Sequence, residues 1–173
     1  MQPTNSSPRI LLPAKPWFIF ATLAIALFLN VVPLGRLPMM PDWVALVLIF
    51  WCIHQPLKVG MGAAFALGLL MDVADASVMG QHSLAYVLLA FGAGVLSRRI
   101  LWFPLIQQAL HTLPMLLGTQ VIMLAIRLAA GSEVPTVLWF LGSFVGAALW
   151  YPLTYLLLLP QYRPIERDEN RPI

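Results

Sequence analysis

The sequence predicts an all-α integral membrane protein, a six-transmembrane-helix bundle with both termini cytoplasmic. Three observations predict this fold: the composition, six apolar segments and the placement of the basic residues. Of the 173 residues, 60% are hydrophobic and only 10% are charged, and the mean hydropathy is +0.84. A soluble domain has roughly 45 to 50% apolar and about 25% charged residues. The polar side chains are too few to cover a compact surface in water, so lipid must be the main solvent, which excludes most cytosolic enzyme and nucleic-acid-binding classes.

The first three segments are one full-length span and a pair of short helices. A helix rises about 1.5 Å per residue, so crossing a hydrocarbon core of roughly 30 Å takes about 20 residues. Trp17–Leu34 is long enough. Pro41–Ile53 begins with Pro41 and Asp42, which suit a helix N-terminus because proline lacks a donor there and a carboxylate faces the positive end of the dipole. It is short, as is the third segment, Val59–Met71, so we expect two brief helices around a polar turn.

The fourth to sixth segments complete the bundle. The fourth, His82–Leu96, ends at the polar triplet 97–99. An aromatic and proline-containing connection, Ile100–Gln108, leads to the fifth segment, Ala109–Ile126. The sixth, Val137–Leu159, is the most apolar, and its tryptophan and tyrosine side chains suit the membrane interface.

The basic residues test this topology, because cytoplasmic loops of membrane proteins carry an excess of Lys and Arg. With six crossings and a cytoplasmic N-terminus, eight basic residues lie inside and two outside. Merging the two short segments into one crossing would place Arg98 and Arg99 outside, which the rule disfavours. The inside set is Arg9, Lys15, Lys58, Arg98, Arg99, Arg163, Arg167 and Arg171, and the outside set is Arg36 and Arg127.

The domain organisation follows from the same pattern. We expect a cytoplasmic N-terminal segment, 1–16, a membrane domain, 17–160, and a cytoplasmic tail, 161–173. The tail is rich in charged residues and poor in apolar ones, which is typical of a disordered segment.

Asp72 and Asp75 are the candidates for chemistry inside the membrane. Placing a charged side chain there costs free energy, so a charged residue within a span is taken as a functional candidate. If the third helix continued past Met71, the two acids would share one face and could hold a proton or a cation. The sequence favours the alternative, in which both lie in an outer loop closed by Gly80. Asp72 would then follow a helix C-terminus, where the dipole disfavours an anion, so we expect Arg36 or Arg127 as its partner.

No catalytic, cofactor or metal site is predicted. The histidines His54, His82 and His111 lie near span ends, and none has a second ligand at helical spacing. The single cysteine, Cys52, lies in an apolar run. No serine or threonine stands in a recognisable arrangement with a histidine and an acid.

Small residues mark helix packing. Gly60 and Gly68 lie along the third segment, and Gly142 and Gly146 form a small-xxx-small spacing in the sixth. Such spacings let helices approach closely. Two interpretations stay open: packing within this bundle, or a seam for another membrane protein.

The second to fourth segments carry a set of motifs in a fixed order. Pro41-Asp42-Trp43-Val44 opens a helix ending in Trp51, Val59-Gly60 and Gly68-Leu69-Leu70-Met71-Asp72 follow, and then Gly80 and Leu84-Ala85-Tyr86. Together with Pro104–Ala109 and Gly146–Pro152, this set resembles the MreD family of rod shape-determining proteins over residues 17–160. At Asp75-Ala76-Ser77 the chain departs from the family's usual glycine-serine pair. The candidate structural and interaction residues are therefore Pro41, Asp42, Trp43, Gly60, Gly68, Asp72, Gly80, Gly142 and Gly146.

The resemblance implies a non-enzymatic component of the bacterial inner membrane that supports peptidoglycan synthesis and rod cell shape. The implied partners are MreC, RodA with its transpeptidase, MreB indirectly, and membrane lipid. Neither nucleic acid nor a small-molecule ligand is expected. We expect the bundle to pack against the single membrane helix of MreC, through the Gly142–Gly146 face or the two short helices.

Two alternatives belong to other functional classes. The family is similar in fold to the membrane substrate-binding subunits of energy-coupling-factor transporters, which suggests a vitamin-binding subunit whose outward pocket would use Trp43, Asp72, Asp75 and Tyr86. A small proton or cation carrier would instead need Asp72 inside the membrane.

Overall fold

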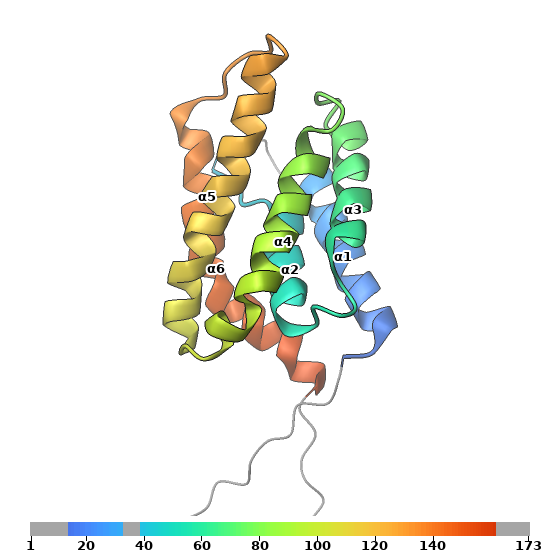
Figure 1. The fold of residues 1–173 in the computed structure, drawn as a ribbon, viewed down its shortest axis with the longest axis vertical. Coiled ribbons are helices and arrows are strands. Elements are labelled where there is room, and N and C mark those ends of the chain that lie inside the picture. Colours follow the sequence, from blue (N-terminus) through green and yellow to red (C-terminus); the bar gives the residue numbers. More distant parts are fainter. Residues whose placement is uncertain (1–13, 33–38, 162–173) are drawn as a thin grey trace, which may run out of the picture.

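The computed structural model describes residues 14–32 and 39–161, and all regular secondary structure in this part of the chain is helical (Figure 1). The expected all-α fold is confirmed. The elements are α1 (Pro16–Val31), α2 (Trp43–His54), α3 (Met61–Ala74), α4 (Gln81–Leu101), α5 (Leu105–Ala129), the 3-10 helix η1 (Val137–Phe140), α6 (Leu141–Leu158) and the 3-10 helix η2 (Leu159–Gln161).

Successive helices run in alternating directions, so the bundle has two distinct ends (Figure 1). We call the end with Ala14, the 55–60 turn and Gln161 the terminal end. The end with the 75–80 and 130–136 connections is the distal end. At the terminal end, Lys58 Nζ donates to the Ala14 carbonyl at 2.7 Å, which ties the start of α1 to the turn between α2 and α3.

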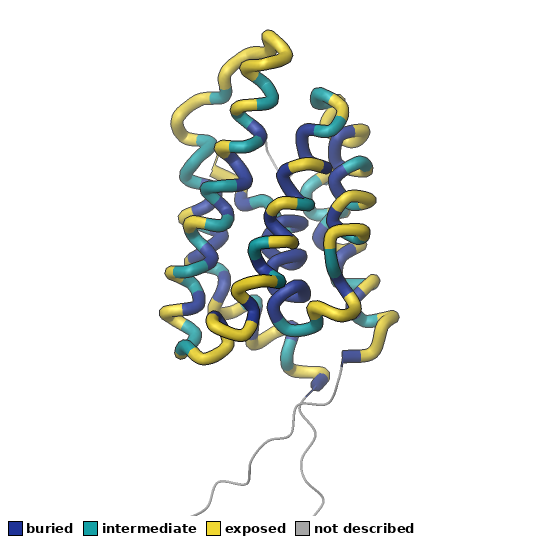
Figure 2. Tube along the Cα trace, viewed as in Figure 1, coloured by how far each residue is buried: buried dark blue, intermediate teal, exposed yellow. Residues whose placement is uncertain are grey.

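The short helix α2 is the core of the bundle. Every residue from Val44 to Ile53 is buried, and α2 packs against α1, α4, α5 and α6 (Figure 2). A helix that is apolar on all sides is buried on all sides. Its 12 residues span only about 18 Å, less than a hydrocarbon core, but the neighbouring helices separate it from lipid.

Among the described residues, three helices, α4, α5 and the η1–α6–η2 unit, are long and apolar enough to cross a membrane. The remaining three, α1, α2 and α3, are shorter apolar helices of 16, 12 and 14 residues. The helix α1 ends at Val31, short of the expected end at Leu34. Residues 33–38 lie outside the described residues, as do the N-terminal segment before residue 14 and the tail after residue 161.

Several predicted boundaries were wrong. α3 runs on through Asp72 to Ala74, and α4 continues past the expected stop at 97–99 to Leu101. α5 begins at Leu105, so the connection is only 102–104 instead of Ile100–Gln108. Basic residues in a last helical turn face the negative end of the dipole, so Arg98 and Arg99 extend α4 and do not terminate it.

Of the four glycines that the sequence marks for helix packing, all but Gly60 pack against other parts of the chain. A Cβ on Gly68 would overlap the Ser83 backbone and lie 2.7 Å from the His82 carbonyl carbon. A Cβ on Gly142 would lie 2.6 Å from the Met40 carbonyl oxygen, whereas Gly60 has open space around it.

Gly146 also faces inward, where its Cβ would lie 3.0 Å from Leu116 Cδ1 and 3.7 Å from Pro41 Cβ. The small-xxx-small spacing in α6 therefore brings α5 and the start of α2 close to α6. This is the first of the two interpretations left open by the sequence, packing within the bundle.

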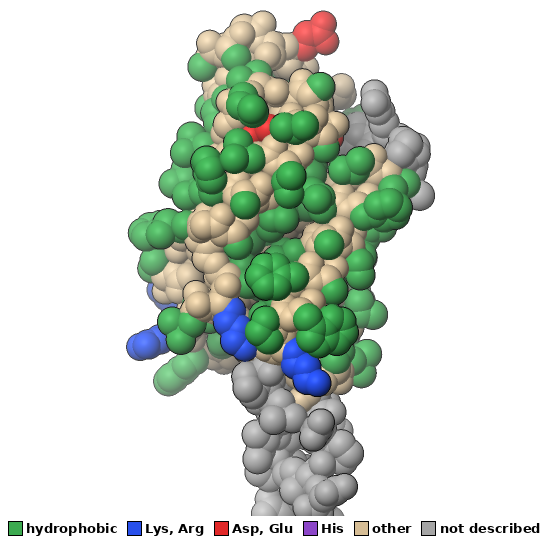
Figure 3. Space-filling model, turned by 90° about the vertical axis from the view of Figure 1, so that its right-hand side faces the viewer, with side chains coloured by type: hydrophobic (Ala, Val, Ile, Leu, Met, Phe, Trp, Pro, Cys, Tyr) green, Lys and Arg blue, Asp and Glu red, His purple; other side chains and the backbone are tan. Residues whose placement is uncertain are grey.

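The basic residues of the described helices gather at the terminal end. Lys and Arg side chains lie at that end of the face in Figure 3, while acidic side chains lie toward the distal end. Arg98 and Arg99 occupy the last turn of α4, and Lys58 follows α2, all at the terminal end. Arg127 in the last turn of α5 is the basic residue that the described helices bring to the distal end.

The α3–α4 crossing yields a stability test with a matched control in the same helix. We expect Gly68→Ala to destabilise the protein by about 1–3 kcal/mol, because the added methyl group must push the backbone of α4 away. Gly62→Ala meets nothing within 4 Å and should leave stability unchanged or slightly raised. Thermal unfolding of both variants in detergent checks this, and equal midpoints would contradict the crossing.

Candidate functional site

Asp72 caps helix α4 from the neighbouring helix α3. The first N–H groups of a helix have no intrahelical acceptor, and the N-cap residue of α4, Gly80, has no side chain to serve them. The buried Asp72 carboxylate accepts from the backbone N–H of Gly80 and of His82, each at 2.8 Å, and from Ser83 Oγ at 3.1 Å. One carboxylate thus satisfies the distal start of α4 and joins it to α3.

His82 connects the two acids that the sequence singled out. Its Nδ1 lies 2.9 Å from Asp72 Oδ1, and its Nε2 lies 3.8 Å from Asp75 Oδ2. The expectation that Arg127 is the partner of Asp72 was wrong, because Arg127 contacts Gln81 instead. Arg36, the other expected partner, lies outside the described residues. The loop placement of Asp72 was also wrong, since Asp72 lies in the last turn of α3 and Asp75 is the C-cap.

Gly80 makes this capping geometry accessible. Its φ is +93°, in the left-handed region that side chains rarely adopt. This conformation turns the Gly80 N–H toward Asp72 Oδ2 while the chain enters α4. The expectation that Gly80 closes the connection after α3 agrees with this position.

A second carboxylate, Asp42, caps α2 as its sequence position predicts. Its Oδ1 accepts from the Ala45 N–H at 3.0 Å and from Asn30 Nδ2 at 2.9 Å. Its Oδ2 accepts from the hydroxyl of the buried Tyr86 at 2.7 Å. Asn30 Oδ1 in turn accepts from the Trp43 N–H, so α1, α2 and α4 meet at one polar cluster. Pro41 precedes the N-cap and is not itself the first helical residue.

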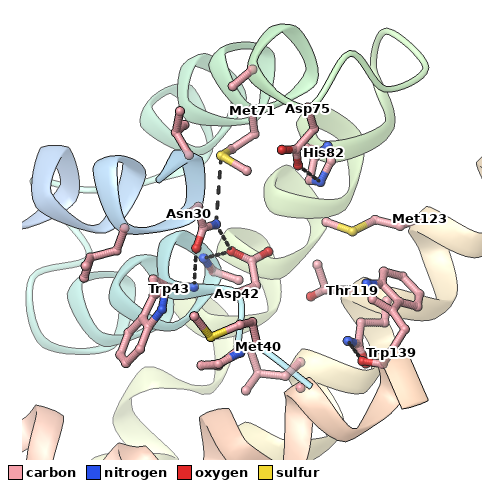
Figure 4. A pocket seen from close by; sticks show the side chains of 18 of the residues that line it. Asn30, Met40, Asp42, Trp43, Met71, Asp75, His82, Thr119, Met123 and Trp139 are labelled. Carbon is pink, nitrogen blue, oxygen red and sulfur yellow. Dashed lines mark hydrogen bonds and ion pairs between the residues drawn. The ribbon is translucent and has the colours of Figure 1, made fainter. Parts of the chain in front are cut away.

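A cavity of about 800 Å³ lies at the distal end, beside both carboxylate clusters. Asn30, Asp42 and Trp43 form one wall, and Thr119, Met123 and Trp139 lie across from them (Figure 4). Asp75 and His82 line it as well. Ala74 and Ala76 are exposed lining residues, so the cavity reaches the surface. Its size falls in the range of small-molecule pockets.

The α5–α6 wall of the cavity is fixed by its own hydrogen bonds. Gln120 Nε2 donates to the Trp139 carbonyl at 2.9 Å, and Ser143 Oγ donates to Gln120 Oε1 at 2.6 Å. Next to them, Arg127 Nε donates to Gln81 Oε1 at 3.1 Å, and the guanidinium carbon lies 5.7 Å from the centre of the Trp139 ring. Arg127 therefore links α5 to the start of α4.

The structure brings Asp42, Trp43 and Gly142 to this cavity, and Asp72 and Gly80 to the cluster beside it. Of the residues expected in a pocket, Trp43 and Asp75 line it, whereas Asp72 and Tyr86 stand behind its wall. Gly60 and Gly68 lie elsewhere along α3.

Sequence reasoning missed three polar residues, Asn30, Gln81 and Gln120. Each is a polar side chain in or beside an apolar run, which in a membrane protein indicates a specific partner. That signal was present in the sequence, but the partners lie 12 to 46 residues away.

Both Asp72 oxygens are engaged by donors from the 77–83 stretch, which favours a capping role over a carrier that binds and releases protons.

Replacement of Asp72 by asparagine tests the cap. The amide has one oxygen and two N–H groups, so one side of it would face the N–H donors of α4 without accepting. We expect Asp72→Asn to lower stability by about 2–3 kcal/mol, since a buried bond to a charged group is lost. Asp75→Asn removes the same charge from a side chain that is 43% exposed and should have the smaller effect. Melting temperatures in detergent check the pair, and the reverse order would contradict the assignment.

Comparison with known proteins agrees with the resemblance seen in the motifs. The family model described as rod shape-determining protein MreD matches residues 9–159. A relative from Haemophilus influenzae, named rod shape-determining protein MreD, is 32% identical over 152 residues, which cover 82% of this chain and 89% of the relative. No solved structure matches the chain. A family match over most of the length and a relative that aligns nearly end to end lead to one conclusion: this chain belongs to the MreD family of rod shape-determining proteins.

Proposed function

We propose that this protein is a non-enzymatic subunit of the cell-elongation complex in the bacterial inner membrane, where it binds MreC and thereby supports peptidoglycan synthesis. RodA with its transpeptidase and, indirectly, MreB complete the proposed assembly. Membership of a shape-determining family supports the process. The partner and its binding site are the proposal.

The proposed topology has six crossings and cytoplasmic termini. The described chain begins and ends at the same end of the bundle, as an even number of crossings requires (Figure 1). Lys15, Lys58, Arg98 and Arg99 belong to the terminal end, and Arg127 to the distal end. The positive-inside rule therefore supports a cytoplasmic terminal end and an outward-facing distal end.

The distal cavity is the observation that carries the choice of docking site. Of the two seams first considered for MreC, the Gly142–Gly146 face is filled by this chain's own helices, and on the short helix α3 the Gly68 side is filled in the same way. The cavity, in contrast, is a volume of about 800 Å³ with aromatic, thioether and charged walls. Since the distal end faces outward in this topology, the segment that can reach it is the stretch of MreC just outside its membrane helix.

A second candidate, a membrane subunit that binds a small molecule such as a vitamin, is favoured by the same cavity. Such a site needs a mostly preformed concave pocket with a few polar groups. Trp43, Trp139 and Asp75 supply these features.

Filling the cavity with a side chain tests the docking site. Ala74 is exposed and lines the cavity, and Ala66 is exposed on the same helix but does not line it. We expect Ala74→Trp to reduce the MreC that co-purifies with the tagged protein from its native membrane by at least tenfold, because the indole occupies the site. Ala66→Trp should capture as much MreC as the unmodified protein.

Mass spectrometry of the same eluates for proteins and small molecules separates the two candidates. Equal capture of MreC by both tryptophan variants would contradict docking in the cavity. A stoichiometric small molecule that Ala74→Trp releases, with no elongation protein present, would favour the binding subunit.

A further inference from the structure

We propose that Arg127 is a carboxylate-binding residue of the distal cavity, which receives an acidic group of the segment that docks there. This inference rests on the proposed function and adds the chemistry of the occupant. Arg127 lines the cavity and is half-buried in its wall. The acid can come from MreC or from a free small molecule, and the test below distinguishes these sources.

Arg127 is held in place by groups that leave part of its guanidinium unused. Its Nε donates to Gln81 Oε1 at 3.1 Å, and its planar group lies 5.7 Å from the centre of the Trp139 ring. A guanidinium has five N–H donors, and its outer pair matches the two oxygens of a carboxylate. The two contacts therefore orient Arg127 without using that pair.

No carboxylate of the described residues forms an ion pair with Arg127. Both ion pairs found between residues 14–32 and 39–161 involve His82. Of the two acids in the cavity wall, Asp75 pairs with His82. Asp42 accepts hydrogen bonds from Ala45, Asn30 and Tyr86. Arg127 therefore lines the cavity without a carboxylate partner among the described residues.

Gln81 gives an independent indication that Arg127 is positioned for a purpose. Gln81 is fully buried, and its Nε2 has no hydrogen-bond partner, although buried amide groups are nearly always paired. The amide cannot turn over, because its Nε2 would then face the Arg127 N–H. The protein thus leaves one donor unpaired and keeps the oxygen that orients Arg127.

Arg127 also departs from the charge distribution of the bundle. Four basic residues of the described chain belong to the terminal end, and the bias against positive charge on the outer side acts against an arginine here. The C-terminal dipole of α5 stabilises the charge in place, but it provides no ligand for the outer N–H pair.

The test compares Arg127→Gln with Arg98→Gln, which removes the same charge from the last turn of α4 at the opposite end. Each tagged full-length protein is purified in mild detergent from its native membrane, and co-purified MreC and retained acids are quantified by mass spectrometry. We expect Arg127→Gln to capture at least tenfold less MreC, and Arg98→Gln to capture the unmodified amount. Arg127→Lys keeps the charge but loses the paired donors, so it should capture an intermediate amount, and it decides the test if Arg127→Gln does not fold.

A charge exchange then identifies the source of the acid. Each acidic residue of MreC just outside its membrane helix is changed to arginine and co-expressed with Arg127→Glu. Restored capture by one exchange assigns the carboxylate to MreC. A small acid retained by the unmodified protein and lost from Arg127→Gln assigns it to a free ligand.

The failures of the two proposals are distinguishable. Unchanged MreC capture by Arg127→Gln overturns the carboxylate site and leaves the proposed function standing. No MreC with the unmodified protein counts against the proposed function, and the carboxylate site is then overturned as well unless a small acid depends on Arg127. Reduced capture that no charge exchange restores, with no acid lost, would show that Arg127 acts only through packing.

Discussion

The distal starts of α2 and α4 depend on two carboxylates, and the arrangement of the other helices depends on those starts. Backbone N–H groups next to lipid must find acceptors within the protein, at a cost of several kcal/mol for each one left unpaired. Asp42 serves α2 and is held by Asn30 of α1 and Tyr86 of α4. Asp72 of α3 serves α4. The two caps therefore fix four helices relative to one another.

The cavity follows from this arrangement. The capped ends of α2 and α4 form one wall, and the α5–α6 pair, locked by Gln120 and Ser143, forms the other. Arg127 and Gln81 bridge the two walls at one point. Because polar bonds within the protein hold each wall, the shape of the volume between them is fixed by this chain alone.

The sequence predicts the helical fold, the order of the elements and the cap at Asp42, because the length of an apolar segment and its capping residues are local signals. It misplaces the end of α3, because the donors that stabilise Asp72 in the helix, at Gly80 and His82, come from the next helix. It also cannot decide which way small residues face. Gly146 packs inward only because α5 and Pro41 converge on it. The cavity itself arises from contacts between distant segments, so no local sequence pattern predicts it.

Photo-crosslinking from inside the cavity tests the central claim, that MreC docks there, most directly. Met123 is buried and lines the cavity, while Val121, on the same helix, is 55% exposed and does not line it. A photoreactive amino acid at each position, in cells that contain the complete elongation machinery, reports what lies within reach. Crosslinks to MreC from position 123 and none from position 121 are the predicted result. Crosslinks to MreC from position 121 alone, or from neither position, would contradict docking in the cavity.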